Sequence, residues 1–419
     1  MKVLWFTNTP CSAVEKLGMK NNYGGWLRSL EEELNKKPEI DLAICFYSYK
    51  NIDAFQYNGT SFYPVHRKGK KSKLKRMYKR FVPGNNDEQE IRKLLKVIDN
   101  FKPDLIHVHG TEDNFGLVQM HTNIPVVTSM QGILNAIAEK YYDGINANIA
   151  KRYEGLPLKL IGSGTKRTYA TFSKKAERER KILRVTKYII GRTAWDNRIS
   201  RLLAPDSLYF IGNEILRKPF YENHWNKNKF GNPIHIVTTS SDSLYKGFET
   251  IIKTAQILTN ETNLNFSWKV IGLNDNSTIV KIVEKWKKIN CKAVNIELLG
   301  TMDEKQIIET MLDADMYIQT SHIENSSNSL CEAMILGMPI IASFAGGSNS
   351  ILLDNTNNIF VQSGDPYSLA GSVLRILKDP SHAIMLGNKN RCIAMERHNK
   401  QNIINNLVNI YEIILSKYS

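Results

Sequence analysis

Cysteine is scarce in this sequence, with five among 419 residues: Cys11, Cys45, Cys291, Cys331 and Cys392. They are odd in number and scattered along the chain, and no two of them form a C-x-x-C pair. This pattern favours neither a disulfide framework nor a zinc site. It indicates a protein of a reducing compartment.

Long hydrophobic runs are also missing, because no stretch approaches the roughly 20 apolar residues that a membrane-spanning helix needs. The segment Met1–Pro10 passes from a charged residue into a short apolar stretch without the longer core of a signal peptide. We therefore expect a cytoplasmic protein that is peripheral on the inner face of the cell membrane.

Acidic residues are outnumbered, since 41 Asp and Glu stand against 56 Lys and Arg, for a formal net charge of +15. Such an excess predicts an acidic partner: a nucleic acid, an anionic membrane surface or a phosphorylated substrate. The densest basic stretch, His66–Phe81, places Leu74, Met77 and Tyr78 at helical spacing among its lysines and arginines. It predicts a basic amphipathic helix on an anionic membrane surface. No nucleic-acid motif accompanies it, so we expect no nucleic-acid partner.

The length and the hydrophobic pattern predict two domains. A chain of 419 residues with 42% hydrophobic content is too long for one core. Strands and helices alternate in both halves, which predicts two Rossmann-like, doubly wound parallel sheets facing each other across a cleft. We expect an N-terminal domain over residues 1–220 and a C-terminal domain over 221–399 that begins with a linker at 221–233. The amphipathic helix at 400–419 should pack back on the N-terminal domain.

Particular elements follow from the same pattern. Strands are expected at 2–7, 41–47, 104–109, 124–130, 187–191 and 209–213, then at 234–239, 268–272, 294–299, 316–320 and 339–343. Helices are expected at 26–36, 87–101, 174–185, 247–259, 280–288, 304–312 and 402–417, and a hairpin at 51–65.

The segment 321–347 is the richest in chemistry. It contains Glu324 and Glu332, with seven residues between them. Residues 325–328 are Asn-Ser-Ser-Asn and offer oxygens that could cap a helix, which Gly337 then ends. The free N–H groups and the dipole at such a helix start favour a phosphate. A carboxylate nearby, such as Glu332, suits vicinal ribose hydroxyls.

A family resemblance rests on these residues. Glu324, Glu332, Ala333, Gly337 and Pro339 form an E-x7-E-A-G-P pattern, accompanied by the glycine pairs 24–25 and 346–347 and by Lys246-Gly247. In this pattern the chain resembles a family 4 retaining glycosyltransferase of the GT-B fold (glycosyl transferases group 1), of the bacterial surface-polysaccharide type. The resemblance covers nearly the whole chain and is best between residues 234 and 380.

The resemblance implies a role for each matching residue. Glu324 and Lys246 would be catalytic, with Glu324 contacting the transferred sugar and Lys246 neutralising the diphosphate of the donor. Glu332 would hold the ribose, and the loop from Gly300 to Met302 would bracket the base. Backbone N–H groups would complete the phosphate cradle, from Gly24, Gly25, Asn328, Ser329 and Leu330. No metal and no cofactor is implied, because the nucleoside diphosphate sugar is a substrate.

The chain departs from the family pattern at three places. Ser240 and Ser241 stand where the family often has an arginine before the phosphate-binding lysine, and Arg192 is a candidate replacement. Gln131 stands where a histidine often touches the sugar, and Ser350 where a glutamate is common. We therefore assign Gln131, together with His109 and Asp196, to the acceptor or the sugar. Arg192 and Asp196 could instead pair with each other on the surface, and His107 is expected to be a core histidine.

The activity implied by the resemblance is the retaining transfer of a hexose from a nucleotide sugar to a hydroxyl of a saccharide or lipid-linked acceptor in surface-polysaccharide biosynthesis. Two alternatives remain open. One is a GT-B sugar-nucleotide epimerase, which would need further acid and base residues in the cleft. The other is a non-catalytic basic protein that binds a membrane or a nucleic acid.

Overall fold

The computed structural model describes residues 1–19, 25–67, 87–155, 164–352 and 359–418. The first half contains a sheet of order β3-β4-β2-β1-β5-β6-β7-β8. Its neighbouring strands are parallel except for the hairpin β3-β4, which confirms the hairpin expected at 51–65. The strands are β1 Lys2–Thr7, β2 Asp41–Ser48, β3 Phe55–Tyr57, β4 Thr60–His66, β5 Leu105–His109, β6 Val126–Ser129, β7 Tyr188–Gly191 and β8 Leu208–Ile211.

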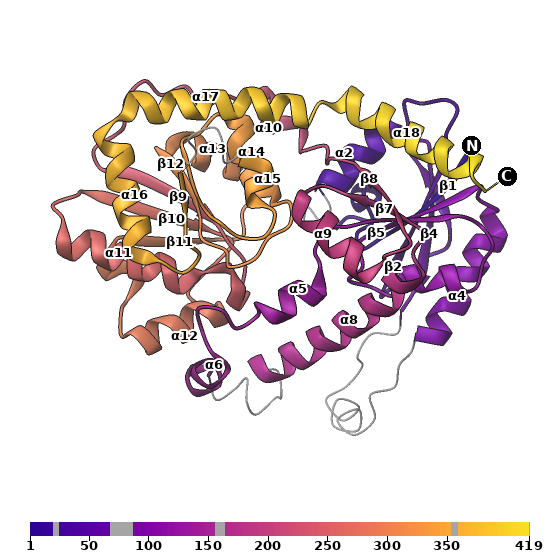
Figure 1. Ribbon diagram of the computed structural model, residues 1–419, viewed down its shortest axis with the longest axis horizontal. Coiled ribbons are helices and arrows are strands. Elements are labelled where there is room, and N and C mark those ends of the chain that lie inside the picture. The colour runs from indigo at the N-terminus through magenta and orange to yellow at the C-terminus, as the bar shows by residue number, and fades with distance from the viewer. Residues whose placement is uncertain (20–24, 68–86, 156–163, 353–358, 419) are drawn as a thin grey trace.

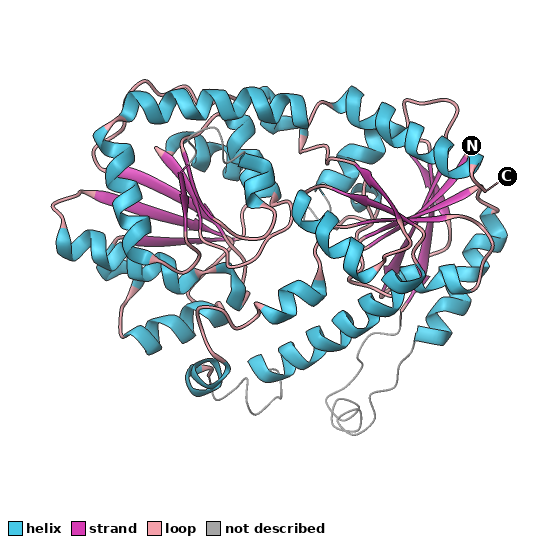
Figure 2. Cartoon of the chain, in the orientation of Figure 1, coloured by secondary structure: helices cyan, strands magenta, loops and turns pink. Residues whose placement is uncertain are grey.

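The second half contains a parallel sheet of order β11-β10-β9-β12-β13-β14. Every residue of β12 and β13 is buried, because helices cover both faces of the sheet (Figure 2). The predicted α/β architecture of the GT-B type, with two such sheets, is confirmed. The strands are β9 Ile234–Thr239, β10 Phe266–Ile271, β11 Ile296–Gly300, β12 Met316–Gln319, β13 Ile340–Ser343 and β14 Ile359–Val361.

Each helix expected from the sequence is present, and α4 begins and ends at the predicted residues. Other helices, such as α9 and α17, were not predicted. The helices before the second sheet are α1 Ala13–Lys16, α2 Gly25–Leu34, α4 Asp87–Phe101, α5 Leu134–Glu139, α6 Ala147–Tyr153, α8 Thr165–Val185, α9 Ala194–Leu203 and α10 Lys218–Glu222. The later ones are α11 Phe248–Glu261, α12 Thr278–Lys287, α13 Glu304–Asp313, α14 Asn328–Leu336, α15 Ser348–Leu352, α16 Pro366–Lys378, α17 Pro380–Arg397 and α18 Lys400–Ser416.

The two halves are connected along both sides of the molecule. On one side α17 and α18 run from the second half to the first (Figure 1). There the apolar face of α18 packs against the first core, and the Tyr411 hydroxyl accepts a hydrogen bond of 3.0 Å from the Trp5 indole. His107 lies 2.6 Å from the same hydroxyl and 2.6 Å from Ser129 Oγ, which confirms it as a satisfied core histidine.

On the other side, residues of α6 and of the start of α8 pack into the second core. Ile145 and Ala150 are buried there beside Phe248 and Ile251 of α11, and Tyr169 packs against the same cluster. This packing explains why α8 begins at Thr165 and not at residue 174 as expected, since its first turns contact the second half. The sequence pattern of one segment could not reveal a contact with a distant one.

The segment expected to be a linker is also part of the second core. Trp225 is 2% exposed, and its indole N–H donates to the carbonyl of Ala314 at 2.7 Å. Phe220 of α10 is fully buried beside it. The Asn- and Lys-rich composition of residues 221–233 suggested a free connection, but these two aromatic residues anchor the segment.

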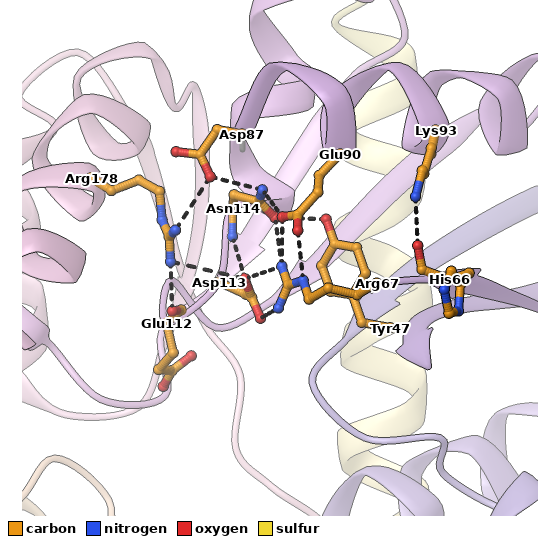
Figure 3. A network of polar contacts seen from close by, with 10 residues as sticks. All are labelled: Tyr47, His66, Arg67, Asp87, Glu90, Lys93, Glu112, Asp113, Asn114 and Arg178. Carbon is orange, nitrogen blue, oxygen red and sulfur yellow. Dashed lines mark hydrogen bonds and ion pairs between the residues drawn. The ribbon is translucent and has the colours of Figure 1, made fainter. Parts of the chain in front are cut away.

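An ion network joins Arg67, near the start of the basic stretch, to α4 and to the loop after β5 (Figure 3). The Arg67 guanidinium lies 2.9 Å from Glu90 and 2.8 Å from Asp113, and it stacks 3.5 Å over the ring of Tyr47. Asp87, at the start of α4, accepts from Asn114 at 2.9 Å. The side chain of Arg67 therefore has a structural role and is not expected to contact a membrane. The basic amphipathic helix predicted within His66–Phe81 lies outside the described residues, apart from His66 and Arg67.

Candidate active site

The N-terminus of α14 lies at the carboxyl edge of the second sheet, directly after β12 and its loop. Ser327 is the N-cap residue and accepts a hydrogen bond from the N–H of Leu330 at 3.5 Å. The cap therefore uses the N–H of Leu330, one of the predicted phosphate ligands. The N–H groups of Asn328 and Ser329 begin the helix, where intrahelical partners are missing. The N–H groups of these two residues, both predicted to bind phosphate, can therefore donate to a ligand at the helix start.

A pocket of about 380 Å³ opens at this helix start. It brings together Glu324, Glu332, Lys246, Gly25, Asn328 and Ser329, which are six of the residues predicted to bind the donor or to act in catalysis. Trp26, Leu216, Arg217, Ser326 and Ser327 complete its lining. We refer to it as the donor pocket.

Lys246 and Glu324 form an ion pair in this pocket. Glu324 also accepts a hydrogen bond of 2.8 Å from the hydroxyl of Ser321. Burial alone would lower the pKa of Lys246, but the charge of Glu324 offsets this and raises the pKa. Lys246 therefore stays protonated in the unliganded pocket and can offer its charge to an anion.

Arg217 and Glu332 form the second ion pair of the pocket. Arg217 Nε and Nη2 each lie 2.8 Å from one oxygen of Glu332, in a bidentate arrangement. Burial raises the pKa of Glu332, and Arg217 counteracts part of that rise. The two carboxylate oxygens of Glu332, which were predicted to bind the ribose, are thus paired with Arg217 in the unliganded protein.

Gly25 makes room for this arginine at the first position of α2. A Cβ added at Gly25 would lie 2.7 Å from Cδ of Arg217, so a larger residue would displace the side chain. The other glycine of the predicted pair, Gly24, lies outside the described residues. The structure thus gives Gly25 a steric reason to be glycine.

Arg217 was not predicted, although one feature of the sequence indicated that a cation was missing. Ser240 and Ser241 left the pocket one cation short, and Arg192 was the expected replacement. Arg192 lies outside the donor pocket, with Nε 3.4 Å from Glu214 and its guanidinium 4.3 Å over Trp26. Arg217 supplies the second cation from the segment between β8 and α10, far from the lysine in sequence.

A comparison with protein families decides the class of this pocket. Residues 220–392, which include Lys246, Glu324 and Glu332, match the family model described as glycosyl transferases group 1. This stretch of the chain is therefore similar to the group 1 glycosyltransferases. This confirms the resemblance on which the site residues were chosen.

Known proteins resemble this chain in sequence or in fold. An uncharacterized glycosyltransferase of Methanocaldococcus jannaschii is 23% identical over 193 residues, which are 45% of this chain and 48% of that protein. The match thus spans about half the length of that curated relative. Sucrose-phosphate synthase from Thermosynechococcus elongatus has a similar structure, with a TM-score of 0.72, 14% identity and full coverage of both chains. HepE of Anabaena in complex with UDP gives a TM-score of 0.62 at 13% identity, covering 98% of this chain and 100% of HepE.

The remaining predicted site residues within the described part of the chain do not line the donor pocket. Asp196 is fully buried; it accepts from the backbone N–H of Arg192 at 2.8 Å and forms a capping box with Thr193 at the start of α9. Arg192 and Asp196 therefore do not pair through their side chains on the surface. His109 is fully buried too, and its ring stacks 3.8 Å from that of His107. Gly300 is the last residue of β11 and Met302 lies in the loop after it, and neither lines the pocket.

Asn325 connects the two halves beside the donor pocket. It had been expected as a possible helix cap, but its Nδ2 donates to the carbonyl of Gln131 at 2.9 Å and to Asp196 at 2.9 Å. Its Oδ1 accepts from the hydroxyl of Thr193 at 2.7 Å. Gln131 thus reaches the junction through its backbone, next to the loop that carries Glu324.

One buried cluster of the described residues has the spacing of a metal site. One ligand atom each from Glu214, Cys331 and His398 lie within 4.8 Å of one another. Burial would raise the pKa of Glu214, but Arg192, His398 and Arg397 lower it to about 2. Because a guanidinium already neutralises this carboxylate, we interpret the cluster as a buried ion pair. The absence of a metal remains a prediction.

Proposed function

We propose that this protein is a retaining, metal-independent glycosyltransferase that moves a hexose from a nucleoside diphosphate sugar to a hydroxyl of a saccharide or lipid-linked acceptor. One observation carries the proposal. Lys246, Arg217 and the N-terminus of α14 converge on one pocket that also holds Glu324 and Glu332. Two cations and a helix start suit a diphosphate.

The two ion pairs exchange partners when the donor binds. The ribose hydroxyls take the place of the Arg217 guanidinium on Glu332, and Arg217 turns to the diphosphate. Lys246 likewise contacts a phosphate while Glu324 accepts from a hydroxyl of the sugar. The leaving diphosphate gains negative charge as the glycosidic bond breaks, and fixed positive groups aimed at that charge are commonly the largest catalytic factor.

The same pairs support retention without an enzymic nucleophile. Both carboxylates that line the donor pocket are already paired with a cation, Glu332 with Arg217 and Glu324 with Lys246. We propose that the leaving phosphate accepts the proton of the acceptor hydroxyl on the same face of the sugar. Lys246 and Arg217 supply the charge that a divalent metal would otherwise contribute.

The solved neighbours favour a nucleotide-sugar donor, since HepE of similar fold was solved with UDP and with UDP-glucose. The acceptor is less constrained. We propose that the acceptor is a growing surface polysaccharide that is extended at the cytoplasmic face of the membrane. This location is proposed because the basic stretch 66–81 predicts contact with anionic lipid. Across the described residues, each helix is either too short or too polar to span a membrane.

Incubation with donor alone and with donor plus acceptor tests the activity. A transferase yields a new glycoside only with acceptor, whereas an epimerase yields an epimeric nucleotide sugar from the donor alone. Glu332→Ala is expected to lose most turnover while keeping the fold; Glu309→Ala, on the exposed face of α13, is the matched control. Near wild-type turnover of Glu332→Ala contradicts the site assignment.

Sedimentation with phosphatidylglycerol vesicles tests the membrane contact separately. Replacement of the lysines of residues 68–81 by glutamine should abolish co-sedimentation and leave transfer to a soluble saccharide unchanged. Because Arg67 holds the ion network around Glu90 and Asp113, it is kept in this variant. Unchanged sedimentation of the variant refutes the membrane contact.

A further inference from the structure

A second cavity, of about 1150 Å³, lies between the two halves of the molecule. Its walls come from the segment between α5 and α6 and the start of α9 on one side, and from α12 and the loops after β12, β13 and β14 on the other. We call it the aromatic groove after the rings that line it: Tyr142, Trp195, Trp286, Phe344 and Phe360.

These rings are all at least partly exposed to solvent. Of the six tryptophans of the chain, Trp5, Trp225 and Trp268 are at most 2% exposed, whereas Trp195 and Trp286 are partly exposed and both line the groove. Phe344 is 52% exposed and is supported edge-on by Phe360, with 5.6 Å between the ring centres. Exposed rings gathered in one concave site indicate a ligand surface.

The charges of the groove disfavour an anionic ligand. Lys140 and Asp143 line it as an ion pair of 2.8 Å. His322 is buried, with its ring nitrogens 2.6 Å from Glu249 and 2.7 Å from Ser363. Among the described residues that line the groove, the others carry no charge. Lys287 is near, with Nζ 3.6 Å from the ring centre of Trp286, but it is not among the lining residues. The described lining of the groove therefore suits a neutral ligand better than a phosphate or a nucleotide.

The groove shares a wall with the donor pocket. Ile323 lines the groove and the next residue, Glu324, lines the donor pocket. Gly346 also lines the groove, and a Cβ there would collide with the carbonyl oxygen of Glu324. A ligand in the groove therefore has one end beside the loop that carries Glu324.

We propose that the aromatic groove binds a neutral oligosaccharide, namely the chain of the acceptor; this rests on the transferase function proposed above. Aromatic rings offer flat apolar faces that match the C–H faces of pyranose rings. The side-chain amides of Asn146 and Gln362 can bond sugar hydroxyls. Trp195 and Trp286 come from different halves, so a bound chain contacts both.

Tryptophan fluorescence of the full-length protein tests this binding. The probes are glucose, maltotriose and maltohexaose and the chitin fragments of the same lengths. We expect quenching by at least one series, with an affinity that rises with chain length. Trp286→Ala and Trp195→Ala should each weaken binding about tenfold, the scale of one aromatic contact, while Trp286→Phe retains most of it.

Two controls make the result decisive. Tyr49→Ala removes an aromatic residue that is 74% exposed outside the groove and should bind like wild type. UDP and the other nucleoside diphosphates should stabilise wild type and Trp286→Ala equally. If the wild type binds sugars in the groove but binds no nucleoside diphosphate, the proposed function is refuted and this inference is not. The oligosaccharide assignment is overturned if no sugar quenches the fluorescence, or if the tryptophan variants bind sugars as tightly as the wild type. It is also overturned if sodium decanoate, a soluble fatty acid, quenches the fluorescence and no sugar does.

Discussion

The donor pocket and the aromatic groove share a wall and differ in almost every other respect. The donor pocket is lined by two ion pairs, Lys246 with Glu324 and Arg217 with Glu332. The groove is lined by partly exposed rings and has a single ion pair at its edge, Lys140 with Asp143. Two cations, Lys246 and Arg217, line the donor pocket, whereas Lys140 is the one lysine or arginine among the described residues that line the larger groove. This difference teaches that the two cavities suit ligands of different charge.

The largest expected effect is on catalysis in the donor pocket. Lys246→Ala removes a cation aimed at the leaving diphosphate and should reduce kcat by about 10²- to 10³-fold. Oligosaccharide binding in the groove should not change, as measured by fluorescence. Lys305→Ala, which removes an exposed lysine that pairs with Glu309 on α13, is the matched control. Equal losses in both measurements would show that the two sites are one.

The next largest effect is on stability, and it distinguishes charged residues that stabilise the fold from those proposed to bind the ligand. Glu214 lies beside the donor pocket, where Arg192, His398 and Arg397 lower its pKa to about 2 from an ordinary 4.5. A carboxylate with a lowered pKa stabilises the fold above the unfolded pKa, and this stability is lost as pH falls through the folded pKa. Glu214→Gln should therefore lower the unfolding free energy by about 3 kcal/mol at neutral pH.

Urea denaturation from neutral pH to about pH 3 measures this contribution. The difference between wild type and Glu214→Gln should shrink as pH falls below 4.5. A difference that is constant with pH would show that the charge of Glu214 is not what stabilises the native state.

A smaller loss is expected at the arginine that sequence reasoning missed. Arg217→Ala should weaken nucleoside diphosphate binding by about 10- to 100-fold, the scale of one charge-assisted bidentate contact. Arg217→Lys should recover part of the loss, because it restores the charge without the fork. Calorimetry of each variant gives the affinities, and an unchanged affinity in Arg217→Ala would mean that Arg217 serves only Glu332.

The smallest effect separates the two cavities without any mutation. Added salt screens the attraction between a nucleotide and the cations of the donor pocket, so affinity should fall by a few-fold between low and physiological ionic strength. Binding of a neutral oligosaccharide in the groove should be insensitive to the same change. Parallel titrations at several salt concentrations measure both, and a matching salt dependence would contradict a neutral groove.

Much of the fold follows from local pattern. Burial and periodicity determine helices such as α4 and the strands of both sheets, so the sequence predicts them well, except for the short edge strand β14. Within the candidate site, the segment from Glu324 to Glu332 was predictable because one loop and one helix carry it. The pairing of Lys246 with Glu324 joins elements that are consecutive around one sheet edge.

The rest depends on contacts between distant segments. Arg217 reaches Glu332 because Phe220 and Trp225 anchor its segment on the second core, and polar neighbours in the sequence hide those anchors. Trp195 and Trp286 face one groove only because α9 and α12 lie on opposite sides of the cleft. Neither arrangement has a local periodicity that a sequence pattern could report.

A thermal-shift titration with uridine, guanosine, adenosine and cytidine diphosphates tests the central claim most directly. A ligand that binds only the native state raises the melting temperature with the logarithm of its excess concentration. At least one of these diphosphates should stabilise the wild type, and both Lys246→Ala and Arg217→Ala should lose most of the shift. If none stabilises the wild type, or if both variants shift like the wild type, the donor pocket is not a nucleoside diphosphate site.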